Sequence, residues 1–205
     1  MSSIFTITAA PDSDIWRKPP HTDVFNAATA TPPNTPSPTG PLQTFVSAKA
    51  SFSFDWTEQY DQAGLLLSFR PQGGSSSSSS APNKWIKTGV EFYNGQPMLS
   101  TVACDRWADW SVAPLTTFAA AAETWTTILI EKEVNENETN ERGSSLWVYQ
   151  VLDSGERVAL REICWVYGDD DIQWELEVLA MAARPAKKAT TGLEVRVRDM
   201  EVEWS

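Results

Sequence analysis

The sequence predicts an all-β fold, a two-sheet antiparallel β-sandwich. Apolar residues almost nowhere recur at the spacing of an amphipathic helix. Short apolar runs are instead separated by clusters of Gly, Pro, Asn and Ser, which is typical of consecutive strands. The last run alternates Leu193, Val195 and Val197 with charged residues, so it has one buried face and one solvated face, as a sandwich requires.

Nine segments carry the strand pattern, which is enough for two packed sheets. The run AGLLLSF is nearly all apolar and is expected to be central. The segment KWIKTGVEFY alternates and ends at Asn94-Gly95, a strong hairpin signal. WELEVLAMAA is rich in helix-forming residues, but a strand is preferred because a lone helix has no obvious place in the series. The predicted strands are residues 44–56, 63–69, 84–93, 97–105, 125–134, 146–152, 157–167, 173–183 and 193–204.

The length of 205 residues predicts a single β-sandwich domain, residues 1–205, whose strands are separated by three conspicuous segments. Residues 28–41 are proline-rich and too polar to pack, which predicts an extended connector after a short N-terminal strand. Residues 71–83 contain a serine tract and are predicted to be a flexible loop within a long hairpin. Residues 135–145 are predicted to form a charged, solvated loop.

Composition argues against several partners. The formal net charge is −11 and no basic stripe occurs, so neither nucleic acid nor an anionic membrane surface is expected as a partner. No run reaches the length of a membrane span, and the first residues lack the pattern of a secretory signal. A cytoplasmic protein is therefore expected, with Cys104 and Cys164 as reduced, buried thiols.

The first candidate site lies on the segment KWIKTGVE. Strand alternation places Trp85, Lys87 and Glu91 on one face, while Ile86 and Val90 suit the sandwich interior. Lys87 and Glu91 are then about 13 Å apart along the strand, too far to pair but able to point into one concavity. This predicts a polar groove floored by the three residues. The alternative is an ordinary outward face with weak cross-strand ion pairs.

Two further clusters offer residues for the rim of this groove. Asp61 and Gln62 precede the apolar strand, where they either cap backbone N–H groups in a turn or bind ligand hydroxyls. Gly64 fits a bulge or a close approach of two backbones. In DRWADWS, two tryptophans three residues apart, Trp107 and Trp110, flanked by Asp105 and Asp109, offer an aromatic platform with carboxylates, which suits a sugar ring. The alternative is that Trp110 pins a loop to the core.

Residues for catalysis or metal binding are sparse. Glu-X-Glu pairs begin at Glu131, Glu175 and Glu201, and strand geometry puts the carboxylates of each pair about 6.6 Å apart, but the last two pairs fit a solvated strand. The one histidine, His21, is far from either cysteine, so no Ser-His or Cys-His pair is indicated. The run GDDD at 168–171 could hold calcium but favours a solvated turn. No cofactor and no metal are predicted.

Three motifs, YDQAGLLLSF, KWIKTGVEFYNGQPMLSTV and DWSVAPL, occur in an order and spacing that resemble the concanavalin-A-like jelly-roll family called domain of unknown function 1349. The segment DIWRKPP resembles the fungal branch of that family, which includes a yeast protein linked to the regulation of enolase. The resemblance is densest over residues 54–115. It implies a concanavalin A-like lectin/glucanase jelly roll with a concave, lectin-like face, although fold alone does not carry function.

The expected function is non-catalytic recognition on that concave face. The candidate ligand-binding residues are Asp61, Trp85, Lys87, Glu91, Asp109 and Trp110. The expected ligand is a sugar or sugar phosphate, or a protein partner in carbon metabolism, with enolase suggested by the resemblance alone. One alternative is a carbohydrate-active enzyme, a glycoside hydrolase or polysaccharide lyase, that uses the same face. Another is a scaffold that binds only proteins.

Overall fold

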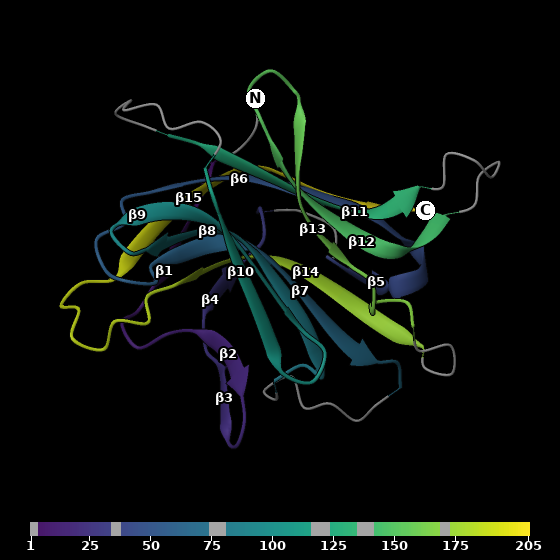
Figure 1. The fold of residues 1–205 in the computed structure, drawn as a ribbon, viewed down its shortest axis with the longest axis horizontal. Coiled ribbons are helices and arrows are strands. Elements are labelled where there is room, and N and C mark those ends of the chain that lie inside the picture. Colours follow the sequence, from purple (N-terminus) through teal and green to yellow (C-terminus); the bar gives the residue numbers. More distant parts are fainter. Residues whose placement is uncertain (1–3, 34–37, 74–80, 116–123, 135–141, 169–172) are drawn as a thin grey trace.

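The computed structural model describes residues 4–33, 38–73, 81–115, 124–134, 142–168 and 173–205. Two antiparallel sheets pack face to face, and a small hairpin lies outside them (Figure 1). The fold is therefore the predicted all-β jelly-roll sandwich. Within the described ranges, no helix is long and apolar enough to cross a bilayer.

One layer is a six-stranded sheet. Its order is β1 (Phe5–Ala9), β15 (Leu193–Trp204), β6 (Phe45–Phe54), β11 (Thr126–Val134), β12 (Arg142–Val151) and β13 (Arg157–Ile163). In β15 the side chains of Leu193, Val195 and Val197 are buried between the sheets, which confirms the predicted alternation. On the outer face of β15, Glu194 is exposed.

The second layer is a seven-stranded sheet. Its order is β10 (Ala108–Pro114), β9 (Gln96–Cys104), β8 (Lys84–Tyr93), β7 (Gln62–Pro71), β14 (Trp174–Ala183) and β4 (Ala28–Ala30), with β5 (Thr39–Pro41) also paired to β14. The central position predicted for β7 is confirmed, as is the strand preferred for β14. The hairpin between β8 and β9 turns at Asn94 and Gly95, whose φ angles of 51° and 79° fit the predicted two-residue turn.

An N-terminal hairpin covers part of the outer face of the seven-stranded sheet. It consists of β2 (Ile15–Lys18) and β3 (Thr22–Phe25), and Figure 1 shows it in purple on the side away from the six-stranded sheet. Ile15 and Phe25 of the hairpin pack against Leu66 and Trp85 of the sheet. We call this second apolar cluster the outer cluster. Because the outer cluster covers the outer face of β7, this strand is buried on both faces. Its sequence therefore does not alternate between apolar and polar residues.

The segment predicted as a free connector, residues 28–41, is partly built into the sheet. β4 pairs with β14 through Ala30 and Ala180, and β5 pairs with it through Pro41 and Glu175. The prediction of a non-packing connector is therefore wrong at both of its ends. Three-residue strands are too short to show alternation, so the sequence pattern could not reveal them.

Strands β2, β3 and β10 were also absent from the predicted series, because most of their side chains are only partly buried or exposed and their runs are short. The predicted Ser-rich and charged loops, and the run GDDD, fall largely on residues 74–80, 135–141 and 169–172, which lie outside the described residues. Cys104 is a buried free thiol as predicted, but Cys164 is exposed, so its predicted burial is wrong. Burial raises the pKa of the Cys104 thiol to about 11, which keeps it protonated at neutral pH.

Candidate functional site

The N-terminal hairpin is fixed in place at one edge by Arg17. Its guanidinium donates hydrogen bonds to the carbonyl oxygens of Pro82 and Asn83, at 3.0 and 2.9 Å, just before β8 begins. The same side chain forms an ion pair with Asp23 across the hairpin, at 3.0 Å. These contacts and the outer cluster hold the hairpin as one wall of a pocket on the sheet.

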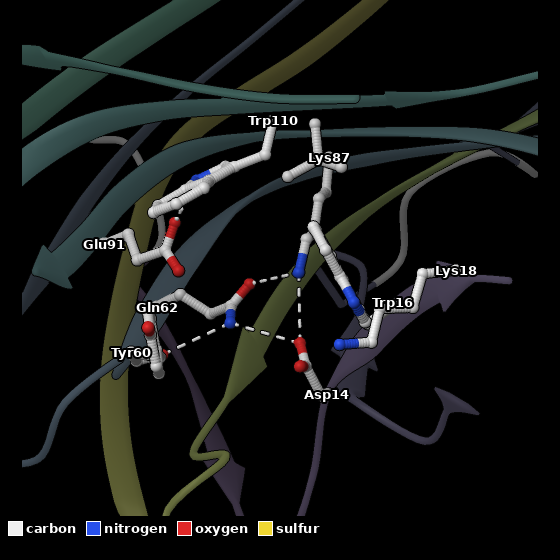
Figure 2. A pocket seen from close by; sticks show the side chains of 9 residues that line it. Asp14, Trp16, Lys18, Tyr60, Gln62, Lys87, Glu91 and Trp110 are labelled. Atoms are coloured by element: carbon white, nitrogen blue, oxygen red, sulfur yellow. Dashed lines mark hydrogen bonds and ion pairs between the residues drawn. The ribbon is translucent and has the colours of Figure 1, made fainter. Parts of the chain in front are cut away.

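The pocket has a volume of about 300 Å³ and lies between the hairpin and strands β7 to β10 (Figure 2). Volumes of about 300–1,000 Å³ are usual for small-molecule sites, so this pocket is at the small end of the range. Its lining combines three aromatic rings with four polar or charged groups and a lysine at the mouth. The lining residues are Asp14, Trp16, Lys18, Tyr60, Gln62, Lys87, Glu91, Val102 and Trp110.

A hydrogen-bonded network forms one side of the pocket. Lys87 is only 5% exposed, and its Nζ donates to Gln62 Oε1 at 2.8 Å and to Asp14 Oδ1 at 3.1 Å. Gln62 Nε2 donates to the same Asp14 oxygen at 3.3 Å and to the carbonyl of Tyr60 at 3.2 Å. The positive charge of Lys87 is thus matched by Asp14, as burial of a charge requires.

Glu91 lies on the opposite side of the pocket, under Trp110. It is 6% exposed, and its Oε2 accepts hydrogen bonds from Ser100 Oγ at 2.6 Å and from Trp110 Nε1 at 3.0 Å. Burial raises the pKa of Glu91 above its ordinary value, and it outweighs these hydrogen bonds and the attraction of Lys87, which act to lower the pKa. A buried carboxylate with a raised pKa in a pocket is a feature of functional sites.

We expect Glu91→Gln to be more stable than the wild type at neutral pH, by roughly 0.5–2 kcal/mol, because it removes a desolvated charge. The wild type has its full stability below the ordinary glutamate pKa, where Glu91 is protonated in both the folded and the unfolded state. This stability falls as the pH rises through the raised pKa of Glu91, because burial disfavours the ionised form in the folded state. Urea unfolding at a series of pH values measures the difference between the two proteins.

The stability difference should shrink towards zero below the ordinary glutamate pKa, where both proteins are uncharged at this position. Glu175→Gln, at an exposed position of β14, is the matched control and should leave the stability at neutral pH unchanged. A Glu91→Gln variant that is less stable than the wild type at neutral pH would contradict this account of the buried charge.

Aromatic rings crowd the mouth of the pocket on the Glu91 side. Tyr60 and Tyr93 stack with their centroids 5.9 Å apart, and Trp110 meets both rings edge to face, at 6.4 and 5.0 Å. Tyr60 is 40% exposed and has a φ of 71°, which is uncommon for an aromatic residue. Such strain persists only where surrounding contacts hold it, and it often accompanies functional positions.

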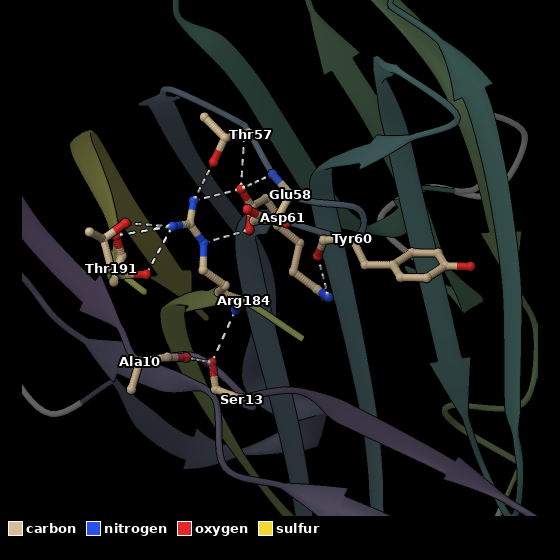
Figure 3. A network of polar contacts seen from close by, with 10 residues as sticks. Ala10, Ser13, Thr57, Glu58, Tyr60, Asp61, Arg184 and Thr191 are labelled. Atoms are coloured by element: carbon tan, nitrogen blue, oxygen red, sulfur yellow. Dashed lines mark hydrogen bonds and ion pairs between the residues drawn. The ribbon is translucent and has the colours of Figure 1, made fainter. Parts of the chain in front are cut away.

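Asp61 follows Tyr60 in the chain, but its side chain points towards Arg184, away from the Tyr60 ring (Figure 3), and is not part of the pocket lining. It is fully buried and accepts two hydrogen bonds from Arg184, at 2.8 and 2.7 Å, and two more from the backbone N–H groups of Thr57 and Glu58. The prediction that Asp61 binds ligand at the rim is therefore wrong, because its carboxylate is buried in these contacts. The alternative of a turn-capping role describes its contacts.

Arg184 completes this buried network without any contact to the pocket. Its remaining N–H groups donate to Thr57 Oγ1 and to the carbonyl oxygens of Thr191 and Gly192. The network ties the turn before β7 to the segment after β14, so it fixes the backbone that carries Tyr60 into the pocket. Its role is structural support of the site.

The structure places three of the six predicted ligand-binding residues on the pocket lining, namely Lys87, Glu91 and Trp110. Trp85 shares the face of Lys87 as predicted, but it is 0% exposed beneath the hairpin, in the outer cluster, and does not floor the pocket. Asp109 points away from Trp110 and forms an ion pair with Arg161 at 2.5 Å. Ligand binding by the three lining residues stays a prediction.

The N-terminal hairpin contributes three residues to the pocket that the sequence pattern did not predict. Asp14, Trp16 and Lys18 all line the pocket, and all come from the segment DIWRKPP, whose predicted significance is its family resemblance alone. The signal available was an acid, an aromatic residue and a lysine at alternating positions, a spacing that puts them on one side of an extended segment. Tyr60 was likewise given no place in the groove.

Two of the other catalytic candidates are engaged in ion pairs on the six-stranded sheet. Glu131 pairs with Arg157 at 2.8 Å, and Glu201 pairs with Lys49 at 3.0 Å, both at exposed positions. His21, in the turn of the hairpin, is not part of the pocket lining. No group of three His, Cys, Asp or Glu residues among those described is arranged to hold a metal ion.

Two packed antiparallel sheets and a ligand-sized pocket on the outer face of one sheet define a jelly-roll sandwich protein with a candidate binding site. Residues 2–204 match the family described as protein of unknown function DUF1349, and the chain belongs to this family. The predicted family resemblance is thereby confirmed.

Individual similar proteins agree with this assignment. An uncharacterized protein from Emericella nidulans is 36% identical over 182 residues, which cover 89% of this chain and 78% of the relative. A functionally unknown protein from Saccharomyces cerevisiae has a similar crystal structure, with a TM-score of 0.66, 18% identity, and coverage of 99% of this chain and 92% of that one.

A more distant structural match is the GlcNAcα1-4Gal releasing endo-β-galactosidase from Clostridium perfringens, with a TM-score of 0.51 and 9% identity. The match covers 82% of this chain but only 39% of the enzyme. At such low identity this similarity shows the sandwich fold alone.

Proposed function

We propose that the protein recognises a carbohydrate in the pocket between the hairpin and the seven-stranded sheet, without chemical conversion. The observation that carries this proposal is the pairing of aromatic walls with polar groups in one small cavity. Trp16, Tyr60 and Trp110 supply flat apolar surfaces, while Lys87 and Glu91 supply hydrogen-bonding groups. A sugar ring matches both, since its C–H faces pack on aromatic rings and its hydroxyl groups donate and accept hydrogen bonds.

The polar groups of the pocket keep unused hydrogen-bonding capacity. Both described hydrogen bonds to Glu91 end on Oε2, and the contacts that Asp14 accepts all end on Oδ1. Lys87 has two described acceptors for its three protons. The cavity therefore offers two carboxylate oxygens and an ammonium proton to a ligand, which a polyhydroxylated molecule can satisfy.

The charges of the pocket favour a sugar over a sugar phosphate. Asp14 neutralises Lys87, and Glu91 adds a further negative charge when ionised. A phosphate group beside Glu91 would be repelled, and the protein as a whole carries a formal charge of −11. Lys18 is the other cation of the lining, and it lies at the exposed mouth.

The competing function is a carbohydrate-active enzyme that uses the same pocket. Its supporting observation is the raised pKa of Glu91, a property that general acids share. A glycosidase also needs a second carboxyl group free to react, and Asp14, the other carboxylate of the lining, forms an ion pair with Lys87 at 3.1 Å. This arrangement supports binding over turnover.

Calorimetric titration with a panel of mono- and oligosaccharides and sugar phosphates tests the proposal. We expect at least one neutral sugar to bind, and Trp110→Ala to weaken that binding about tenfold or more by removing an aromatic wall. Trp147→Ala is the matched control, since Trp147 stacks on Tyr149 on the outer face of the other sheet. Its affinity should equal that of the wild type.

Two results would contradict the proposal. One is the absence of binding across the whole panel, which would leave the protein-binding scaffold as the better account. The other is the release of a new reducing end or an unsaturated product from an oligosaccharide, lost in Glu91→Gln, which would make the protein an enzyme.

We further propose a regulatory role in carbon metabolism. Its support is the family resemblance of the segment DIWRKPP, which suggests a link to enolase. In this account a sugar in the pocket would alter the surface of the N-terminal hairpin, which borders the pocket and carries Trp16. Pull-down of purified enolase, with and without a sugar that binds, tests the link; no retention under either condition would refute it.

A further inference from the structure

Glu91 is the one carboxylate of the pocket lining whose charge no described cation contacts. Asp14 is paired with Lys87 at 3.1 Å, whereas the donors to Glu91 are the neutral groups of Ser100 and Trp110. Burying a carboxylate without a cation is costly, and Glu91 is only 6% exposed. The protein therefore buries a carboxylate that no described cation contacts directly, although Lys87 attracts it from a distance.

The unmatched charge faces the cavity. Figure 2 shows one carboxylate oxygen of Glu91 at Trp110 and the other turned away from it, towards the side where Gln62 lies. No described residue donates to this second oxygen, Oε1. Lys18 lies across the pocket from Glu91 in the same view, so it does not supply the missing cation.

The aromatic rings on the Glu91 side of the pocket also favour a positive charge. Trp110 and Tyr60 flank the Glu91 side of the pocket, and aromatic faces attract cations that have lost part of their hydration. A ligand that places an ammonium group here would form a charge-assisted hydrogen bond with Glu91 Oε1. Its remaining hydroxyl groups would meet Asp14, Gln62 and Lys87.

We propose that the preferred ligand is an amino sugar, whose ammonium group pairs with Glu91 while its hydroxyl groups bind the Asp14–Gln62–Lys87 network. This inference rests on the proposed carbohydrate function and narrows it to a class of ligand. The raised pKa of Glu91 agrees with it, since a ligand cation would relieve the same cost of burial.

Titration of the full chain with matched sugar pairs tests the inference. The pairs are glucose with glucosamine and galactose with galactosamine, measured at pH 7, with N-acetylglucosamine as an uncharged amide and choline as a cation without a sugar ring. We expect one amino sugar to bind about tenfold or more tightly than its neutral partner. In Glu91→Gln this preference should disappear, while in Glu175→Gln, at an exposed position of β14, it should remain.

The outcomes separate the inference from the function on which it rests. Equal affinity for both members of each pair would overturn the amino-sugar inference and leave carbohydrate recognition intact. A preference that survives in Glu91→Gln, or choline that binds as tightly as the amino sugar, would also overturn it. Absence of binding by every sugar would overturn both proposals.

Discussion

Replacing Arg184 by methionine is expected to destabilise the fold by about 3–5 kcal/mol, since it leaves Asp61 as an uncompensated buried charge. Arg184 is 4% exposed, and its guanidinium contacts Asp61 at 2.8 and 2.7 Å. Methionine fills a similar volume, so the measured loss of stability arises from the lost charge and hydrogen bonds and not from lost packing. Equilibrium unfolding in urea measures the change.

A second variant separates the ion pair from the packing around it. In Asp61→Asn/Arg184→Met neither residue is charged, so part of the stability lost in Arg184→Met should return. Arg157→Met is the control, because Arg157 forms an exposed ion pair with Glu131 and should cost less than about 1 kcal/mol. A loss below about 1 kcal/mol for Arg184→Met would show that the buried network does not hold the turn before β7.

Replacing Gly89 by alanine is expected to cost about 3 kcal/mol, because the new methyl group has no space. A Cβ on Gly89 would lie 2.5 Å from the Cα of Gly64 and would clash with the carbonyl oxygen of Ala63. Both obstacles are backbone atoms of β7, so the strands would have to separate. Lys87 and Glu91 flank Gly89, so the same change should distort the pocket.

Gly95→Ala is the control for this prediction. Gly95 has a φ of 79° and no atom within 4 Å of an added Cβ, so only backbone strain of about 1 kcal/mol is expected. Thermal unfolding of the two variants beside the wild type measures both effects. Equal losses for Gly89→Ala and Gly95→Ala would show that the close approach of β7 and β8 is unimportant.

Strand periodicity made much of the fold and part of the site predictable. Alternation in KWIKTGVE put Lys87 and Glu91 on one face and Ile86 on the other, and all three lie as expected. The close approach suggested for Gly64 is present, against Gly89. These features depend on residues near one another in one strand, which a sequence pattern can reveal.

Two errors came from grouping neighbours that an extended chain separates. Asp61 precedes Gln62, and Asp109 precedes Trp110, and adjacent residues of a strand point to opposite faces. In each pair the second residue lines the pocket and the first does not. Strict alternation, applied at the strand ends, would have divided both pairs correctly.

The remaining errors concern contacts between distant parts of the chain. Trp85 lies on the predicted face but is covered by Ile15 of the hairpin. Asp14 reaches Lys87 by the same fold-back of the N-terminus. Nothing in a short polar segment such as DIWRKPP indicates which sheet it will cover, because that choice depends on the assembled apolar surface of the sheet.

The most direct test of carbohydrate recognition is an amide and indole NMR spectrum of the ¹⁵N-labelled protein during addition of sugars. Ten tryptophans give ten indole signals, and the Nε1–H of Trp110 is bonded to Glu91 inside the pocket. We predict that a sugar shifts the signals of Trp110 and Trp16 and leaves those of Trp125 and Trp147 unchanged. No shift with any sugar, or shifts confined to Trp125 and Trp147, would contradict a carbohydrate site in this pocket.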